Sequence, residues 1–212
     1  GSRKINDAMK LVVRNMVKDD VAFIFATGKS YYDEFISSIE DLNLKPYQRV
    51  VPYLEDMANA LAASDLVIGS AGAISLAEIT ALGKPSIIIP KAYTAENHQE
   101  YNAKSIEKQG AGVAILEKNL TDVSLNDAVT RLLGNREELL EMANKSKEIG
   151  KPEAIDLIYD EILKIYNANN KEKLHKKESK KSKKEENTDT NVDLDKKEDT
   201  SSQGKVIGIK KK

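Results

Sequence analysis

Residues 64–90 read SDLVIGSAGAISLAEITALGKPSIIIP and form the most informative stretch of the chain. Its two apolar runs, Leu66–Gly69 and Ser86–Pro90, have the length of buried strands, and a helix is predicted between them over residues 75–82. This is one β-α-β unit whose helix N-terminus faces the turn after the first strand. Such an N-terminus carries unpaired N–H groups and a partial positive charge, which favour a phosphate. The stretch therefore predicts a nucleotide- or pyrophosphate-binding protein.

Similar short apolar runs recur along the chain and alternate with helical segments. Further strands are predicted at Val21–Ala26, Arg49–Tyr53 and Val113–Leu116. Helices are predicted at 4–18, 30–42, 55–63, 98–109, 124–133, 136–148 and 153–167, and Gly83, Gly110 and Gly134 stand where helix C-caps are expected. Continuously apolar strands are typical of a parallel sheet that is covered on both faces. The expected fold class is α/β, a Rossmann-like parallel sheet with helices on both faces.

Charge and composition divide the chain into two parts. Residues 1–168 carry a net charge of −6 and are predicted to form the domain, whereas residues 169–212 carry +5, with 14 Lys and 9 acidic residues. The second part lacks the apolar surface that would offset the entropy of ordering, so a disordered, Lys-rich tail is predicted. The acidic domain argues against nucleic acid as the main ligand.

Composition also excludes several kinds of site. The chain contains no Cys, so disulfides, thiolate metal sites and cysteine nucleophiles are ruled out. No His, Asp or Glu spacing resembles a metal site, and no apolar run approaches the length of a membrane span. The chain begins with Gly1 and not Met, so the sequence leaves two explanations open: Gly1-Ser2 is a cloning scar, or the chain is cut from a longer one.

Ser75 and Glu78 have the spacing of a capping box at the start of the predicted helix. In the alternative interpretation, Glu78 accepts hydrogen bonds from the hydroxyls of a ribose. Gly72 and Ala73 precede them, and such small residues let a diphosphate approach the backbone closely.

A second polar cluster follows the strand at Ser86–Pro90. Residues 96–103 read ENHQEYNA and place His98, Gln99 and Asn102 within about one helical turn. These groups suit sugar hydroxyls and a diphosphate, although Asn97 is also explained as a simple N-cap.

The order and spacing of four motifs resemble the donor-binding C-terminal half of the MurG-type transferases of glycosyltransferase family 28. The motifs are residues 53–57 (YLEDM), 72–78 (GAISLAE), 81–85 (ALGKP) and 97–103 (NHQEYNA). The resemblance covers residues 1–167. It implies the C-terminal half of a GT-B glycosyltransferase, in which two Rossmann-like domains enclose the active site.

The resemblance also implies roles for eight residues in binding UDP-N-acetylglucosamine (UDP-GlcNAc). Leu54 and Met57 would contact the uracil, Ala73, Ile74 and Ser75 the diphosphate, Glu78 the ribose, and His98 and Gln99 the donor sugar. Two positions depart from the family pattern, since His98 stands where Gln is commonest and Ser70 where many relatives have Arg.

The implied reaction is the inverting transfer of GlcNAc from UDP-GlcNAc to a lipid-linked muramyl-pentapeptide (lipid I to lipid II) in peptidoglycan synthesis. No catalytic residue, metal or cofactor is assigned here, because the base and the acceptor site belong to the N-terminal domain of relatives. The chain is therefore expected to be inactive alone, and the whole enzyme to lie in the cytoplasm, peripheral on the inner face of the membrane.

Three alternatives remain open on the sequence. The chain could be the catalytic subunit of a split GlcNAc transferase with a membrane-bound partner. It could be half of a UDP-GlcNAc 2-epimerase, for which only His98 and Glu100 offer acid–base groups. It could also be a non-catalytic UDP-sugar-binding module that scaffolds other proteins through its tail.

Overall fold

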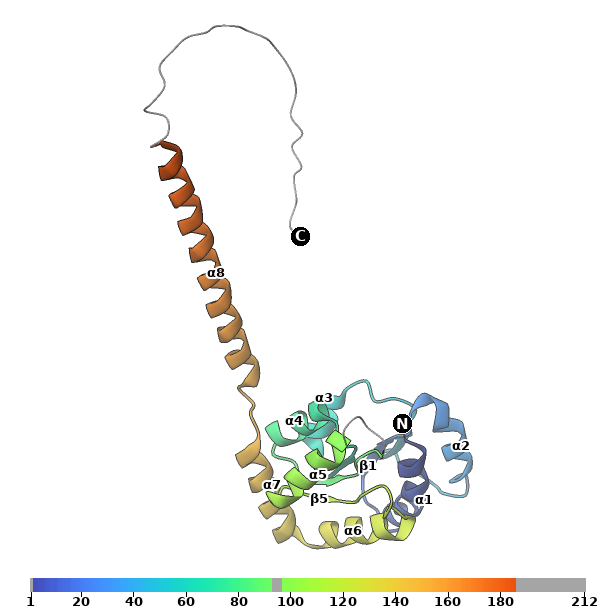
Figure 1. Cartoon of the computed structure of the whole chain (residues 1–212). Coiled ribbons are helices and arrows are strands. Elements are labelled where there is room, and N and C mark those ends of the chain that lie inside the picture. Colours follow the sequence, from blue (N-terminus) through green and yellow to red (C-terminus); the bar gives the residue numbers. More distant parts are fainter. Residues whose placement is uncertain (1, 93–96, 186–212) are drawn as a thin grey trace, which may run out of the picture. The chain divides into compact units, whose positions relative to one another are not determined.

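The structure, a computed structural model of the chain, describes the backbone of residues 2–92 and 97–185, and the side chains of these ranges as far as residue 171. The chain divides into two compact units, Gly1–Ile155 and Asp156–Lys212. The first unit holds all the strands and all the predicted site residues, and most of the last helix belongs to the second (Figure 1).

Among the described residues, five parallel strands confirm the predicted ones, each slightly shorter than expected. They are β1 (Phe23–Ala26), β2 (Gln48–Val51), β3 (Val67–Gly69), β4 (Ser86–Ile88) and β5 (Gly112–Ala114). In the described part of the chain they hydrogen-bond as two sheets, with orders β1-β2 and β3-β4-β5. The register pairs Phe23 with Gln48, and Ser86 of β4 with both Val67 and Gly112.

The helices alternate with the strands as predicted. They are α1 (Arg3–Lys18), the 3₁₀ helix η1 (Lys29–Tyr31), α2 (Tyr32–Ser37), α3 (Met57–Ala63), α4 (Ala73–Ala81), α5 (His98–Lys108), α6 (Asp122–Gly134), α7 (Arg136–Ile149) and α8 (Ala154–Glu185). As expected for C′ positions, Gly83 and Gly110 adopt left-handed backbone angles after α4 and α5, with φ of 62° and 73°. Gly134 is instead the last residue of α6, and Asn135 caps that helix.

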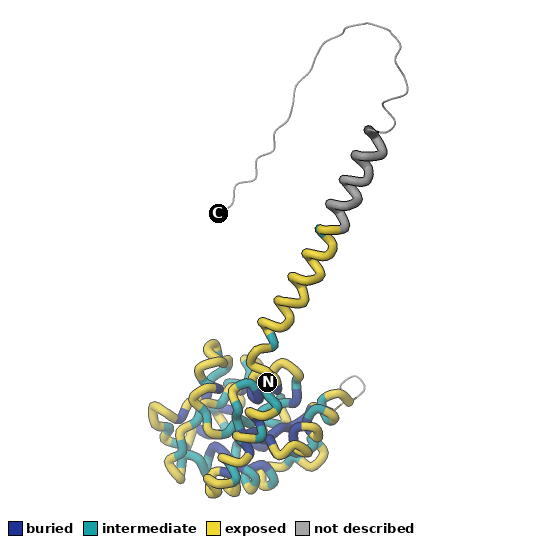
Figure 2. Tube along the Cα trace, turned by 90° about the vertical axis from the view of Figure 1, so that its left-hand side faces the viewer, coloured by how far each residue is buried: buried dark blue, intermediate teal, exposed yellow. Residues whose placement is uncertain are grey.

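Helices cover both faces of the β3-β4-β5 sheet. Successive residues of a strand point to opposite faces, and Ile87 and Ile89 pack in one apolar cluster while Ile88 packs in another. The first cluster contains residues of α1, α2, α6 and α7, together with Val50 of β2, and therefore joins the two sheets. The second contains Leu76 of α4 and residues of α5. Figure 2 shows these buried residues gathered inside the first unit.

Polar side chains attach α1 to the elements around it. The buried Asn6 amide donates to the carbonyl of Thr27 at 2.9 Å, just after β1. The Arg14 guanidinium donates to both carboxylate oxygens of Asp41, at 2.6 and 2.8 Å, and to the carbonyl of Ser38. The hydrogen bonds and charge of Arg14 lower the pKa of Asp41 below its ordinary value.

The charged C-terminal region differs from the sequence prediction. Disorder was expected from Asn169, but residues 169–185 continue α8. The helix extends because residues 154–185 contain no Gly or Pro and are rich in Lys, Glu, Leu and Ile, most of them good helix formers. The rest of the predicted tail, residues 186–212, lies outside the described part.

Candidate donor-binding site

The eight predicted site residues lie in the connections after β2, β3 and β4 or in the helices that these connections enter. Leu54 follows β2, and α3 begins at Met57. The other two connections enter α4 at Ala73 and α5 at His98. Since ligands of open parallel sheets bind beyond the carboxyl ends of the strands, these connections occupy the expected edge.

The start of α4 differs from the prediction. The helix begins at Ala73 with Gly72 as its N-cap, and Gly72 has no side chain that could cap it. Its first helical hydrogen bond runs from the amide of Leu76 to the carbonyl of Gly72 at 3.0 Å. The amides of Ala73, Ile74 and Ser75 precede this bond, and N–H groups at such positions have no partner within the helix.

The capping box predicted for Ser75 and Glu78 is therefore wrong. Ser75 is the third residue of the helix and not its N-cap, because Gly72 at an extended φ of −67° and ψ of 138° already starts the helix. Ser75 and Glu78 are both exposed, and residues three apart lie on the same face of a helix. Glu78 therefore does not cap the start of α4, and its carboxylate can bind a ligand.

Helix α5 supports the turn that precedes α4. The Asn102 amide donates to the carbonyl of Ala71 at 3.2 Å, and Ala71 is fully buried. This bond gives Asn102 a structural role in fixing the turn from which the α4 amides project.

The connection from β4 to α5 is shaped by Gln99. Its side-chain oxygen accepts a hydrogen bond from the amide of Lys91 at 3.0 Å, which leaves the Nε2 group as the end that can donate to a sugar hydroxyl. His98 is exposed as the first residue of α5. Asn97 occupies the N-cap position with a left-handed φ of 54° but makes no side-chain cap bond. Glu96 of the predicted cluster lies outside the described residues.

The connection from β2 to α3 exposes apolar groups beside a capped helix. Asp56 is the N-cap of α3 and accepts from the amide of Asn59 at 3.2 Å. Met57 is 46% exposed and Tyr53 65% exposed, while Leu54 is half-buried. The exposed thioether of Met57 and its apolar neighbours can pack against the flat ring of a nucleobase.

Lys84 joins α3 to the turn after α4, a role that the sequence analysis did not assign. Its ammonium group donates to the carbonyls of Ala62 and Ser64, at 2.7 and 2.9 Å, at the C-terminal end of α3. A cation at this end is also favoured by the helix dipole. The preceding Gly83 lets the chain turn with positive φ.

The sequence also did not predict the role of Glu117. It follows β5, and its carboxylate accepts from the amide of Ala92 at 3.1 Å and lies 3.4 Å from the ammonium group of Lys4. It therefore links the connection after β4 to the first turn of α1. An isolated Glu in a polar loop gave no signal of this role.

Charged side chains on α5 pair along the helix. Glu100 and Lys104 form an ion pair at 2.7 Å, which lowers the pKa of Glu100. Within the described ranges, no three His, Asp or Glu side chains gather where they could hold a metal ion.

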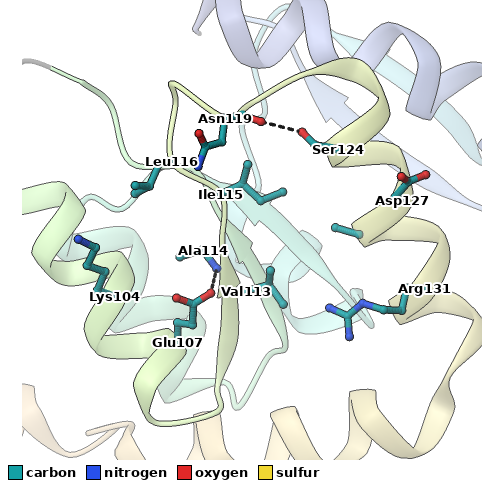
Figure 3. A pocket seen from close by; sticks show the side chains of 11 residues that line it. Lys104, Glu107, Val113, Ala114, Ile115, Leu116, Asn119, Ser124, Asp127 and Arg131 are labelled. Atoms are coloured by element: carbon teal, nitrogen blue, oxygen red, sulfur yellow. Dashed lines mark hydrogen bonds between the residues drawn. The ribbon is translucent and has the colours of Figure 1, made fainter.

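A separate hollow of about 550 Å³ runs along β5 between α5 and α6 (Figure 3). Two of its polar groups serve the fold: Glu107 accepts from the amide of Ala114 at 2.9 Å, and the Ser124 hydroxyl donates to the carbonyl of Asn119 at 3.1 Å. None of the eight predicted residues lines it. The hollow therefore lies beside the edge strand β5, and side chains of β5, α5 and α6 line it. The sequence did not predict this hollow.

Comparison with known proteins identifies the domain. The sequence profile of the glycosyltransferase family 28 C-terminal domain matches residues 1–158. The chain belongs to glycosyltransferase family 28. The whole chain is 75% identical to a protein of Clostridioides difficile, named UDP-N-acetylglucosamine--N-acetylmuramyl-(pentapeptide) pyrophosphoryl-undecaprenol N-acetylglucosamine transferase. The enzyme of the same name from Acetivibrio thermocellus is 45% identical over 78% of the chain.

A solved structure supports the fold of this family 28 domain. The crystal structure of Acinetobacter baumannii MurG matches 77% of the chain with a TM-score of 0.65 and 27% identity. The predicted fold class, a Rossmann-like domain that forms the C-terminal half of a GT-B glycosyltransferase, is confirmed. The chain spans about half the length of its relatives, 51% of the C. difficile protein and 45% of the A. thermocellus protein.

Proposed function

We propose that the chain is the UDP-GlcNAc-binding half of an inverting N-acetylglucosaminyltransferase that acts on a lipid-linked muramyl-pentapeptide. The observation that carries the proposal is the N-terminus of α4, which has no side-chain cap and follows β3 in a family 28 domain. Amides at a helix N-terminus and the helix dipole suit the diphosphate of the donor. The family match favours a transferase over the epimerase that the sequence left open.

Each predicted residue has a role in this proposal. The amides of Ala73, Ile74 and Ser75 and the Ser75 hydroxyl bind the diphosphate, and Glu78 on the same helix face binds the ribose. The remaining four residues keep the roles that the family resemblance implies. Leu54 and Met57 contact the uracil, and His98 and Gln99 bind the GlcNAc. Gln99 does so as a donor, because its oxygen already accepts from Lys91.

The proposed chemistry is a single displacement. A hydroxyl of the acceptor sugar attacks the anomeric carbon of UDP-GlcNAc, the bond to the diphosphate breaks, and UDP leaves with the bonding electrons. Fixed N–H donors at the start of α4 stabilise the negative charge that grows on the departing diphosphate. The proposal requires no cofactor. It assigns the base and the acceptor site to a second domain, which corresponds to the half of the relatives that this chain does not cover.

A lipid-linked acceptor also implies where the enzyme works. We place it on the inner face of the bacterial cell membrane, as a peripheral protein of the cytoplasm, since its donor is a water-soluble nucleotide sugar and its acceptor is held in the bilayer.

Calorimetric titration of the full chain with UDP-GlcNAc tests the donor site. We expect saturable heat from the wild type and none from the double variant Glu78→Ala, Ser75→Ala, because it removes the proposed ribose and diphosphate side chains. Both residues are exposed, so the variant should keep the urea midpoint of the wild type.

The matched control is Asp127→Ala in the hollow along β5, where Asp127 is also exposed. It should bind UDP-GlcNAc as the wild type does. Equal heats from the wild type and the double variant would reject the proposed site, and loss of heat in Asp127→Ala alone would move the site to the hollow.

A further inference from the structure

The β1-β2 sheet ends at an edge of β1 that has free backbone groups. The amides of Phe23 and Thr27 donate to carbonyls of the β2 segment, each at 3.0 Å. Successive residues of a strand turn their N–H and C=O groups to opposite sides, so those of Ile24 point to the other edge of β1. Within the described residues, no strand pairs with that edge.

The β3-β4-β5 sheet has a similar free edge at β3. The amide of Val67 donates to the carbonyl of Pro85 at 3.0 Å, and the carbonyl of Gly69 accepts from the amide of Ile89. Both bonds lie on the side of β4, so the N–H and C=O groups of Ile68 point away from it. Such free groups are a template for pairing with a further strand.

Three helices show that these two free edges face each other. Helix α1 lies between α2 and α6: Arg14 donates to the carbonyl of Ser38, which caps α2, and the Asn15 amide donates to Asn126 of α6 at 2.7 Å. Phe35 of α2 packs against a ring of β1, with 4.9 Å between the ring centroids. Helix α6 shares the first apolar cluster with β4. The order α2, α1, α6 therefore places the free edge of β1 toward β3.

The direction of the helical connections assigns a strand to the position between β1 and β3. Connections between parallel strands are right-handed in about 98% of cases, so all helices on one face of a sheet step in the same direction. Helix α2 steps from β1 to β2, and α1 lies on the same face and leads into β1. The strand that α1 would follow therefore belongs at the free edge of β1. Helices α4 and α5 lie on the other face and step the opposite way, from β3 to β5.

The burial of the strands agrees with an open position there. Strand β4, paired along both edges, is buried at each of its residues. Every residue of β3 is only half-buried, and Ile24 of β1 is 46% exposed. Strands in the middle of a parallel sheet are normally buried on both faces, so β1 and β3 are exposed more than their apolar sequences favour.

The open position also lies beside the candidate donor site. It is the point where the connections change direction, and ligands of parallel sheets bind beyond the carboxyl ends of the strands at such a point. The first turn of α1 lies at that end, because the Asn6 amide donates to Thr27 after β1 and Lys4 pairs with Glu117 after β5. A strand added here ends between the starts of α1 and α4.

We propose that β1 and β3 together accept one further parallel strand, and that this strand strengthens binding of the donor at α4. The strand is an extended apolar segment from outside residues 1–212, and it bonds to Ile24 on one side and to Ile68 on the other. The chain spans about half the length of its relatives, and the half that it does not cover is the proposed source. The effect on the donor rests on the proposed function, whereas the pairing of the strand does not.

Titration of the full chain with the peptide Lys-Lys-Val-Ile-Val-Ile-Val-Lys-Lys tests the pairing. Hydrogen exchange followed by mass spectrometry should show saturable slowing at the amides of Ile24 and Ile68, by at least about tenfold. Strand β5 is the internal control. Its outward amide, that of Ala114, already donates to the carboxylate of Glu107, so exchange in β5 should not change.

A peptide with proline in place of its central valine is the matched control, because proline does not fit a central strand. On the protein, Ile24→Pro removes the free amide and leaves the bonds from β1 to β2 in place, whereas Ile24→Val keeps that amide. The first variant should weaken peptide binding at least about fivefold, since a peptide carbonyl loses its donor, and the second by less than about twofold. The urea midpoint shows whether Ile24→Pro is folded, and the proline peptide gives the same test on the wild type.

Calorimetric titration with UDP-GlcNAc, with and without saturating strand peptide, tests the effect on the donor. We expect the peptide to lower the Kd at least about fivefold and the proline peptide to leave it unchanged. Equal protection by the two peptides, or protection of β5 without β1 and β3, would overturn the strand position. Protection of β1 and β3 with an unchanged Kd would overturn the link to the donor. Protection without any heat from UDP-GlcNAc would instead reject the proposed donor site.

Discussion

Replacing Gly72 by Asp is expected to raise the Kd for UDP-GlcNAc by at least about 100-fold, because two charge-assisted hydrogen bonds of about 1.5–3 kcal/mol each are lost. At the N-cap position the new carboxylate accepts from the same α4 amides that the diphosphate would use, and it also repels the phosphates. Gly72 has a φ of −67°, and a Cβ built there meets no atom within 4 Å. The free protein therefore accommodates the side chain, and a capped helix should be slightly more stable. Calorimetry and urea unfolding measure the two effects.

Gly72→Asn is the control for charge. Asparagine caps the helix about as well as aspartate but does not repel a phosphate. We expect its affinity for UDP-GlcNAc to lie between those of the wild type and Gly72→Asp. Unchanged affinity in Gly72→Asp, with the fold intact, would show that the donor does not use this helix end.

Gly150→Ala is expected to lower the free energy of unfolding by about 3 kcal/mol, the upper part of the range for overpacking a core. Gly150 ends α7 against the backbone of α4. A Cβ there would overlap the carbonyl oxygen of Thr80, lie 2.6 Å from its carbonyl carbon and 3.0 Å from the amide nitrogen of Ala81. Backbone atoms cannot rotate away as a side chain can, so the two helices must separate. Urea unfolding followed by circular dichroism gives the free energy.

Gly134→Ala provides the contrast for this prediction. Gly134 is the last residue of α6, and a Cβ there meets nothing within 4 Å. Alanine is the better helix former by up to about 1 kcal/mol, so this variant should be as stable as the wild type or more so. Similar losses in the two variants would mean that close packing of Gly150 on Thr80 is not the cause.

The strands could be predicted from the sequence because each is a short, continuous apolar run. Ile87, Ile88 and Ile89 are each no more than 1% exposed, which is the burial on both faces that such a run indicates. The family motifs likewise led to the correct fold. The roles of the eight site residues remain a prediction, since binding of the donor decides them.

Other features depended on information that local patterns lack. Ser75 and Glu78 have the spacing of a capping box, yet the helix starts at Gly72, because glycine also serves as an N-cap and the sequence does not show which start is chosen. The length of α8 was missed because a Lys-rich composition suggested disorder, while the absence of Gly and Pro allowed a helix. Lys84 and Glu117 act through partners distant in sequence, which spacing cannot reveal.

The burial of β4 on both faces determines how the domain opens in solution. The amide of Ile89 donates to the carbonyl of Gly69 at 2.8 Å, and β4 is paired along both of its edges. We expect deuterium to reach such an amide only when most of the structure unfolds, and the exposed first turn of α4 to exchange through small local fluctuations. The slowly exchanging amides of β4 and the rapidly exchanging amides of the first turn of α4 therefore lie in separate parts of the domain. A ligand bound at the first turn of α4 would slow exchange there without altering the protection of β4.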